Sequence, residues 1–259
     1  SGAHLVVSKD EPVSPTHARR FSTLLRRAAK GEPLAYLTGI AHFQHLTFIV
    51  TRATLIPRLE TEELVAIVSK KLHAKNEKIL VVDIGTGSGC VAITLAVNHP
   101  ACSVIATDVS LRALNIAKKN AKAHFAQKKQ PITFLRASLF EKQLQNLVEK
   151  ASESHVILFA NLPYVPAKEK PELDKSVVDF EPHTALFGGP IGDELIKKYL
   201  QQVADFQKTS TKTMDVFLEI DPSYAIRLAK WCVTLFPHHH VHLKKDVFDR
   251  TRFLLITAS

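Results

Sequence analysis

The tetrapeptide Asn161-Leu162-Pro163-Tyr164 follows the apolar run 156–160 and carries residue types well suited to chemistry. A short apolar run of this kind is typical of a buried strand, so the tetrapeptide is expected at the mouth of a sheet. The Asn161 side-chain oxygen and the Leu162 carbonyl can each accept one N–H of a planar nitrogen. These hydrogen bonds would orient the nitrogen lone pair and stabilise the positive charge that develops on it. The arrangement favours transfer of a methyl group to an amide or exocyclic amine nitrogen.

Two further residues of the tetrapeptide fit this interpretation. Pro163 fixes the direction of the chain through its locked φ, and Tyr164 offers a ring face on which a flat group can stack. The alternative is an ordinary turn, because Asn and Pro are both common where the chain turns. A glycine-rich turn earlier in the chain favours the catalytic interpretation.

That earlier turn spans residues 83–89 and reads DIGTGSG, directly after the predicted strand 79–84. Glycines at such a position allow a tight turn and close approach of the backbone to a ligand. The GxGxG spacing differs from the dinucleotide-binding GxGxxG, because Cys90 occupies the third glycine position. An ordinary β–α turn is the alternative. Together with the residues that follow, the turn predicts a nucleoside cofactor.

Polar groups also end the next two predicted strands. Asp108 follows strand 103–107, where a carboxylate can accept hydrogen bonds from both ribose hydroxyls of an adenosine. The alternative role for Asp108 is the N-cap of the next helix, which Ser110 could fill equally well. After the third strand come Ser138, Leu139 and Phe140, where a hydroxyl or a backbone N–H can meet an adenine edge.

The elements that must position these residues alternate along the chain from residue 78 onward. Patterns typical of strands lie at 79–84, 103–107, 132–135, 156–160, 216–220, 240–245 and 252–257, with helical patterns at 91–97, 111–125, 144–150, 194–206 and 222–235. Continuously apolar strands between helices predict a parallel sheet covered on both faces. We therefore expect an α/β fold with a seven-stranded, mostly parallel, doubly wound sheet.

The first part of the chain has a different pattern. Residues 17–30 predict an amphipathic helix, residues 40–50 a hairpin, and residues 60–73 a second helix. We expect a short N-terminal helical and hairpin region for substrate docking over 1–50, a connecting segment and helix over 51–77, and an α/β catalytic domain over 78–259. Arg58 and Glu62 in the connecting segment are expected to form an ion pair or to remain solvated separately.

Composition limits the partners. The chain has 259 residues and a formal net charge of +9, which favours an acidic or nucleic-acid partner. Basic residues gather in two stretches, one with Arg19, Arg20, Arg26, Arg27 and Lys30, the other with Arg112, Lys118, Lys119, Lys122, Lys128 and Lys129. An equally good alternative is that the two basic stretches are solvated faces that bind no partner. No apolar run approaches the roughly 20 residues that cross a bilayer, so no membrane partner is expected.

Cysteine and histidine usage points to an ordinary cytoplasmic protein. Cys90, Cys102 and Cys232 form no CxxC pair, which indicates reduced thiols. The three histidines at 238–240, together with His242, have no partner carboxylate or cysteine in the sequence pattern. We therefore expect a polar loop there and no metal ion. We expect a monomer.

The motifs resemble those of the protein-(glutamine-N5) methyltransferases that modify peptide chain release factors, the PrmC or HemK family. The similarity covers nearly the whole chain and includes the linker 31–39 (GEPLAYLTG), the segment 55–62, the glycine turn, the stretch with Glu181-Pro182 and Gly188-Gly189, and Lys245-Asp246 with Arg250 or Arg252. The family usually has proline at the position of Leu162. Because a backbone carbonyl remains there, we expect activity to be retained.

The resemblance implies a Rossmann-like methyltransferase domain and methylation of the glutamine in the Gly-Gly-Gln loop of a release factor, a step connected with translation termination. It implies S-adenosylmethionine as cofactor and S-adenosylhomocysteine as product. The implied catalytic residues are Asn161, Leu162, Pro163 and Tyr164, and the implied cofactor-binding residues are Asp83, Gly85, Thr86, Gly87, Gly89, Asp108, Val109, Ser138, Leu139 and Asn161.

Other functions remain open at this point. An N-methyltransferase of adenine or guanine in DNA or RNA would use the same tetrapeptide after flipping the base. A non-catalytic RNA- or ribosome-binding module would use the two basic stretches and would not need Asn161. A nicotinamide oxidoreductase is disfavoured by the GxGxG spacing. Glu219, at the end of a predicted strand, is expected to be structural.

Overall fold

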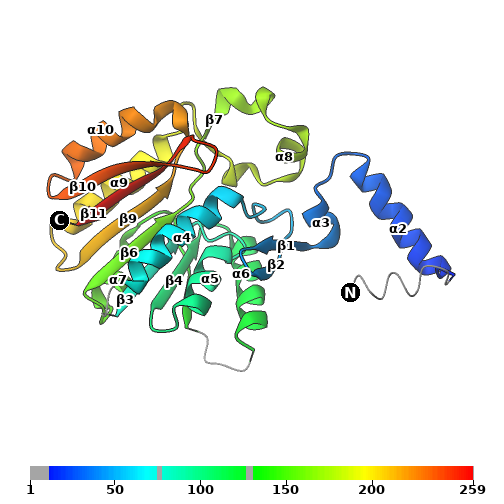
Figure 1. Cartoon of the computed structure of the whole chain (residues 1–259), viewed down its shortest axis with the longest axis horizontal. Helices are drawn as coiled ribbons and strands as arrows, with labels where there is room; N and C mark the ends of the chain where they lie inside the picture. Colours follow the sequence, from blue (N-terminus) through cyan, green and yellow to red (C-terminus); the bar gives the residue numbers. More distant parts are fainter. Residues whose placement is uncertain (1–11, 75–77, 127–130, 259) are drawn as a thin grey trace.

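The computed structural model describes residues 12–74, 78–126 and 131–258. Its centre is a seven-stranded sheet with the order β10-β11-β9-β6-β3-β4-β5 (Figure 1). The strands are β3 (Ile79–Ile84), β4 (Ser103–Asp108), β5 (Ile132–Arg136), β6 (His155–Ala160), β9 (Thr213–Glu219), β10 (His239–Lys245) and β11 (Thr251–Ala258).

The strands from β9 to β5 run parallel, whereas β11 pairs antiparallel with both β9 and β10. Every residue of β3 and β6 is buried, which explains why these strands read as continuous apolar runs. The expected seven-stranded, mostly parallel sheet is confirmed. The carboxyl ends of β3, β4, β6 and β9 therefore meet at one edge, where ligands bind in doubly wound sheets.

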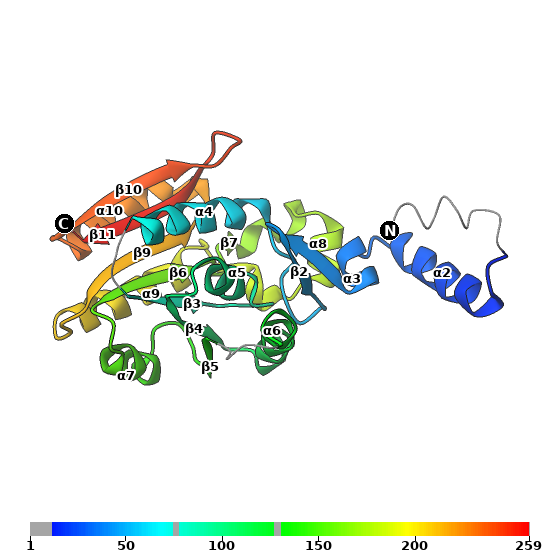
Figure 2. The ribbon, with the colours of Figure 1, turned by 60° about the horizontal axis from the view of Figure 1, so that its bottom comes forward.

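Helices cover both faces of the sheet (Figures 1 and 2). One face packs against α4 (Leu59–His73), α5 (Cys90–Asn98) and α6 (Leu111–His124), and the other packs against α7 (Lys142–Lys150), α9 (Glu194–Gln207) and α10 (Ala225–Leu235). Each face has its own apolar cluster, so the sheet separates two cores. Within the described residues, no helix is both long and apolar enough to cross a membrane.

The N-terminal part begins with the expected amphipathic helix, α2 (Pro15–Ala28), followed by α3 (Leu34–Thr38) and a hairpin of β1 (Ile40–Phe43) and β2 (Leu46–Ile49). Ser14 caps α2 by accepting a hydrogen bond from the His17 amide at 3.3 Å. The hairpin buries Phe43 and Phe48 in the core beside α4. In contrast, α2 buries none of its residues and projects away from the sheet (Figures 1 and 2).

An insertion between β6 and β9 lies over the carboxyl edge of the sheet. It contains β7 (Val165–Pro166), a 3₁₀ turn η1 (Ala167–Glu172), α8 (Lys175–Phe180), a second 3₁₀ turn η2 (His183–Ala185) and β8 (Phe187–Gly189). Because β7 and β8 pair parallel, the insertion returns to the point at which it left the sheet.

Candidate active site

The glycine turn between β3 and α5 is held by hydrogen bonds to its neighbours. The Thr86 amide donates to the Thr107 carbonyl of β4 at 2.7 Å. The buried Asp83 carboxyl accepts from the Thr86 hydroxyl at 2.6 Å and from the Ala92 amide of α5 at 3.2 Å. Desolvation raises the pKa of Asp83 to about 7. The turn is therefore fixed between two elements before any ligand binds.

The last glycine of the turn serves helix packing. Gly89 has a left-handed backbone with φ of 82°. A Cβ there would lie 3.0 Å from Ile93 Cδ1 and 3.1 Å from Ala117 Cβ. Glycine thus satisfies both the backbone and the close contact between α5 and α6. Gly89 does not line the cavity above the turn, unlike the other predicted cofactor residues.

Asp108 connects the end of β4 to the same turn. Its Oδ2 atom accepts from the Gly87 amide at 3.0 Å, and its Oδ1 atom accepts from the Ser110 amide at 2.8 Å. Burial raises the pKa of Asp108. The helix α6 is capped by Ser110, whose hydroxyl accepts from the Ala113 amide at 3.2 Å. The alternative interpretation of Asp108 as that cap is wrong.

A cavity lies above the turn at the carboxyl edge of the sheet. Its lining includes Asp83, Gly85, Thr86, Gly87, Asp108, Val109, Ser138, Leu139, Asn161, Leu162 and Pro163. The Asp108 carboxylate suits hydroxyl groups, the glycines leave the backbone accessible, and Val91 and Leu139 provide apolar walls. These residues fit a nucleoside-bearing cofactor.

The tetrapeptide leaves β6 between this cavity and a second one. Asn161 lines both cavities. The second cavity is lined by Leu55, Arg58, Asn161, Tyr164, Val165, Leu173, Val177, Ala185 and Leu186. The Leu162 side chain is only 4% exposed and packs in the core. All four predicted catalytic residues therefore lie together, with Asn161 at the junction of the two spaces.

Two glycines of the insertion pack directly on the tetrapeptide. A Cβ on Gly188 would lie 2.4 Å from the Pro163 carbonyl oxygen and 2.2 Å from the Gly192 carbonyl oxygen. A Cβ on Gly192 would lie 2.3 Å from the Tyr164 carbonyl oxygen. A side chain at either position would displace the backbone beside Asn161. This contact gives a physical reason for glycine in the stretch 188–192.

The connecting segment is tied to the insertion by a buried carboxylate. Glu181 accepts from the Arg58 guanidinium at 2.6 Å and from the Ile56 amide at 3.3 Å. Of the two alternatives considered for Arg58 and Glu62, the ion pair is wrong, because the fold of the insertion places Glu181 against Arg58 instead. Arg58 lines both cavities, so this ion pair holds a cation at their junction.

Two further polar residues touch the tetrapeptide, and neither was included among the predicted site residues. The Asn161 Nδ2 atom donates to the Thr61 hydroxyl of α4 at 2.9 Å. The Tyr164 hydroxyl donates to the Glu219 carboxylate at 2.7 Å. Glu219 ends β9, the strand next to β6. Its place at a strand end was visible in the sequence, but the adjacency of β9 and β6 was not.

The sheet, the glycine turn and the Asn-x-Pro-Tyr segment after the fourth parallel strand define a Rossmann-like methyltransferase that uses S-adenosylmethionine. Two family models match the chain, the methyltransferase small domain over residues 61–157 and the PrmC N-terminal domain over residues 1–39. The chain belongs to the release factor glutamine methyltransferase family.

Two relatives support this assignment along nearly the full chain. The release factor glutamine methyltransferase of Flavobacterium psychrophilum is 34% identical, with 97% of this chain and 85% of the relative covered. That of Staphylococcus aureus is 32% identical, with 96% and 84% covered. Among solved structures, the hMettl16 catalytic domain in complex with a MAT2A 3'UTR hairpin has a TM-score of 0.57 at 17% identity, covering 80% of this chain and 72% of that one. This last similarity concerns the fold alone.

Proposed function

We propose that this protein transfers a methyl group from S-adenosylmethionine to the side-chain amide nitrogen of the glutamine in the Gly-Gly-Gln loop of a peptide chain release factor. The observation that carries the proposal is the position of Asn161, which lines both the cofactor cavity and the second cavity. The names of the relatives supply the substrate class.

In the proposed reaction, the cofactor cavity would hold S-adenosylmethionine, which would supply an activated methyl group and leave as S-adenosylhomocysteine, while the methylated nitrogen gives up one proton to water. Asp108 would bind the ribose hydroxyls, and the backbone at Gly85 and Gly87 would lie against the cofactor. Ser138 and Leu139 would border the adenine.

The tetrapeptide would hold the substrate amide. Among the residues that the structure describes, the Asn161 Oδ1 atom and the Leu162 carbonyl have no hydrogen-bond partner. Each can accept one N–H of a glutamine side chain, which directs the nitrogen lone pair toward the cofactor cavity. Both oxygens would also stabilise the positive charge that develops on the nitrogen. Tyr164 would form a wall of the second cavity beside the amide.

The test is transfer of label from radioactive S-adenosylmethionine to a purified release factor. Wild-type protein should label the release factor, and a release factor with alanine in place of the Gly-Gly-Gln glutamine should stay unlabelled. Asn161→Ala should reduce the rate by at least about 100-fold, as loss of a preorganised hydrogen-bond group does in other enzymes. Asn115→Ala, at an exposed asparagine of α6, is the matched control.

A nucleic acid substrate is the competing outcome of the same assay. Label that appears in RNA or DNA and not in the release factor would contradict the proposal. We further propose that the protein acts as a monomer in the cytoplasm. Size-exclusion chromatography with light scattering measures its oligomeric state.

A further inference from the structure

A continuous set of hydrogen bonds runs from Asn161 into the protein interior. The Asn161 Nδ2 atom contacts the Thr61 hydroxyl at 2.9 Å, and that hydroxyl contacts Glu219 Oε2 at 2.9 Å. The Tyr164 hydroxyl donates to the other carboxylate oxygen of Glu219 at 2.7 Å. Thr61 is 4% exposed and Glu219 is 1% exposed. This hydrogen-bond chain joins the tetrapeptide, α4 and β9, and Thr61 also borders the cofactor cavity.

The number of protons on each group determines which groups donate and which accept along the hydrogen-bond chain. An ionised carboxylate can only accept, so the single hydroxyl proton of Thr61 is donated to Glu219. Thr61 must then accept from Asn161, which requires the amide nitrogen of Asn161 to face Thr61. The Oδ1 atom is left on the opposite side, free to accept an N–H from a substrate.

A protonated Glu219 would permit the opposite direction. It could donate to Thr61, whose proton would then point at Asn161 and favour the flipped amide. In that orientation the Asn161 NH₂ group would meet the N–H of the substrate, and two donors cannot form a hydrogen bond.

The surroundings of Glu219 bear on its charge. Burial raises the pKa of Glu219, and the negative charge of Glu60 in α4 raises it further. The hydrogen bonds from Tyr164 and Thr61 and the nearby cation Arg252 of β11 lower it, but burial is the largest effect. The Arg252 guanidinium lies 5.6 Å from the centre of the Tyr164 ring. The carboxyl group therefore titrates nearer to neutrality than an exposed glutamate does.

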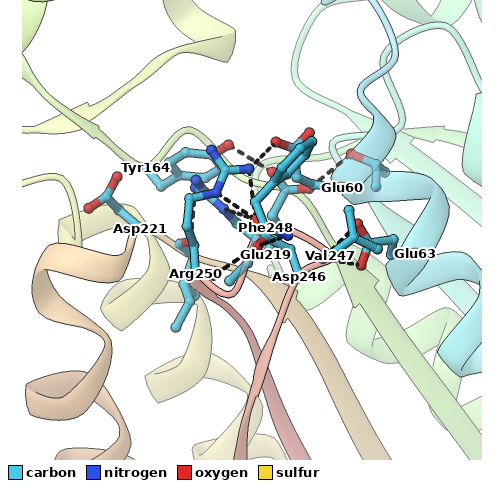
Figure 3. Close-up of polar contacts among 12 residues, drawn as sticks. Glu60, Glu63, Tyr164, Glu219, Asp221, Asp246, Val247, Phe248 and Arg250 are labelled. Atoms are coloured by element: carbon cyan, nitrogen blue, oxygen red, sulfur yellow. Dashed lines mark hydrogen bonds and ion pairs between the residues drawn. The ribbon is translucent and has the colours of Figure 1, made fainter.

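The first turn of α4, which carries Thr61, is fastened to the β10–β11 turn (Figure 3). Arg250 binds Glu60 at 2.7 Å and Asp246 at 2.7 Å. The Val247 amide donates to Glu63 at 3.1 Å. Figure 3 shows Tyr164 and Glu219 beside this cluster. Contacts on both sides of Thr61 therefore limit how far its hydroxyl can move.

We propose that Thr61 and Glu219 are positioning residues that hold the Asn161 amide with its oxygen toward the nitrogen to be methylated. The inference rests on the proposed function and adds two residues to its site. Neither side chain needs to touch the substrate, because each acts through Asn161.

The first test replaces the hydroxyl of Thr61 while keeping the side-chain shape. Thr61→Val should lower kcat for release factor methylation on the order of 10- to 100-fold, the range that follows when a reacting group is misaligned. Thr61→Ser keeps the hydroxyl, and its kcat should stay within about threefold of the wild-type value. The Kd of S-adenosylmethionine, measured by calorimetry, reports separately on the cofactor cavity, which Thr61 also borders, and in Thr61→Val it should change far less than kcat.

A matched control exists in α5. Among the described residues, the buried Thr94 hydroxyl has no hydrogen-bond partner. Thr94→Val therefore removes a buried hydroxyl without breaking a hydrogen bond, and it should retain wild-type kcat.

The second test uses pH. Wild-type kcat should fall on the acidic side as Glu219 gains a proton. Burial also raises the pKa of Asp83 and of Asp108, which border the cofactor cavity and can add an acidic limb of their own. Glu219→Gln cannot ionise, so it should have a low kcat at all pH values and should lose the part of the acidic limb that depends on Glu219, whereas Asp83→Asn should keep that part. A purely structural role of Glu219 would leave the acidic limb in place.

Each outcome decides the inference. Wild-type kcat in Thr61→Val, equal loss in Thr61→Ser and Thr61→Val, a loss of cofactor affinity in Thr61→Val as large as its loss of kcat, or an acidic limb in Glu219→Gln unchanged from that of wild type would each overturn it while wild-type protein still methylates the release factor. Absence of methylation by wild-type protein would instead contradict the proposed function, and the inference with it.

Discussion

Asp83 is a carboxyl group that the fold buries beneath the glycine turn. It is 2% exposed, and its partners are the Thr86 hydroxyl and the Ala92 amide. Burial raises its pKa from 3.8 to about 7. The folded chain therefore keeps a proton that the unfolded chain releases near pH 4. For this group, the free energy of unfolding falls as pH rises from about 4 to about 7 and levels off above that range.

The substitution Asp83→Asn replaces this carboxyl by an amide that cannot ionise. The free energy of unfolding of wild type, relative to that of this variant, should fall as pH rises from about 4.5 to about 7.5, because only wild type must deprotonate a buried carboxyl. Urea unfolding without cofactor measures both curves. Asp179→Asn, at an exposed carboxyl of α8, is the control and should follow wild type. Parallel curves for wild type and Asp83→Asn would contradict the assignment.

At the scale of elements, the insertion between β6 and β9 determines the shape of the site. It supplies Glu181 to the connecting segment and places Gly188 and Gly192 against the backbone of the tetrapeptide. The Gly188 contact is steric, since no positive φ is required there. A methyl group at this position must displace main-chain carbonyl oxygens, which have little freedom to move.

Gly188→Ala should therefore destabilise the protein by about 1 to 3 kcal/mol, the cost of overpacking a closely packed position. Methylation should fall as well, because the displaced carbonyl of Pro163 lies two residues from Asn161. Thermal unfolding and the methylation assay measure the two effects. Gly31→Ala is the control: its added Cβ would meet nothing within 4 Å, and only backbone strain from φ of 85° is expected. A Gly188→Ala variant that melts like wild type would refute the steric argument.

At the scale of the whole molecule, α2 extends the protein beyond the catalytic domain. Glu32 joins it to the rest through Arg27 at 2.7 Å and Arg52 at 2.9 Å. The side chains of Phe21 and Leu25 are 62% and 52% exposed. A short helix without buried residues gains little stability by itself. We therefore propose that α2 is a docking element for the protein substrate, in keeping with the docking role expected for residues 1–50.

The prediction compares the two basic stretches. Replacing Arg19, Arg20 and Arg26 of α2 by Glu should raise KM for the release factor on the order of tenfold, with kcat and the cofactor Kd unchanged, because charges at the edge of an interface act mainly on association. The same change at Lys118, Lys119 and Lys122 of α6 alters net charge equally and should have a smaller effect. Steady-state kinetics at two salt concentrations test this. Equal losses in both variants would indicate a general effect of charge.

Much of the fold follows from the sequence because it depends on local patterns. Continuous apolar runs predict the parallel strands, and the glycine turn after the first of them predicts a cofactor site at its carboxyl end. The tetrapeptide after strand β6 predicts the second half of the site. These signals are local, since burial on both faces and tight turning each impose a residue type at fixed spacing.

The tertiary structure alone determined which distant residues meet these motifs. Glu181 replaced Glu62 as the partner of Arg58, and Ser110 took the capping role considered for Asp108. The hydrogen-bond chain from Asn161 depends on β9 lying next to β6 and on the first turn of α4 reaching the carboxyl ends of these strands. The order of strands is set by packing between segments far apart in the chain, which no local pattern of residues encodes. The Asn-x-Pro-Tyr motif was therefore readable in the sequence, whereas the residues that form hydrogen bonds with it were not.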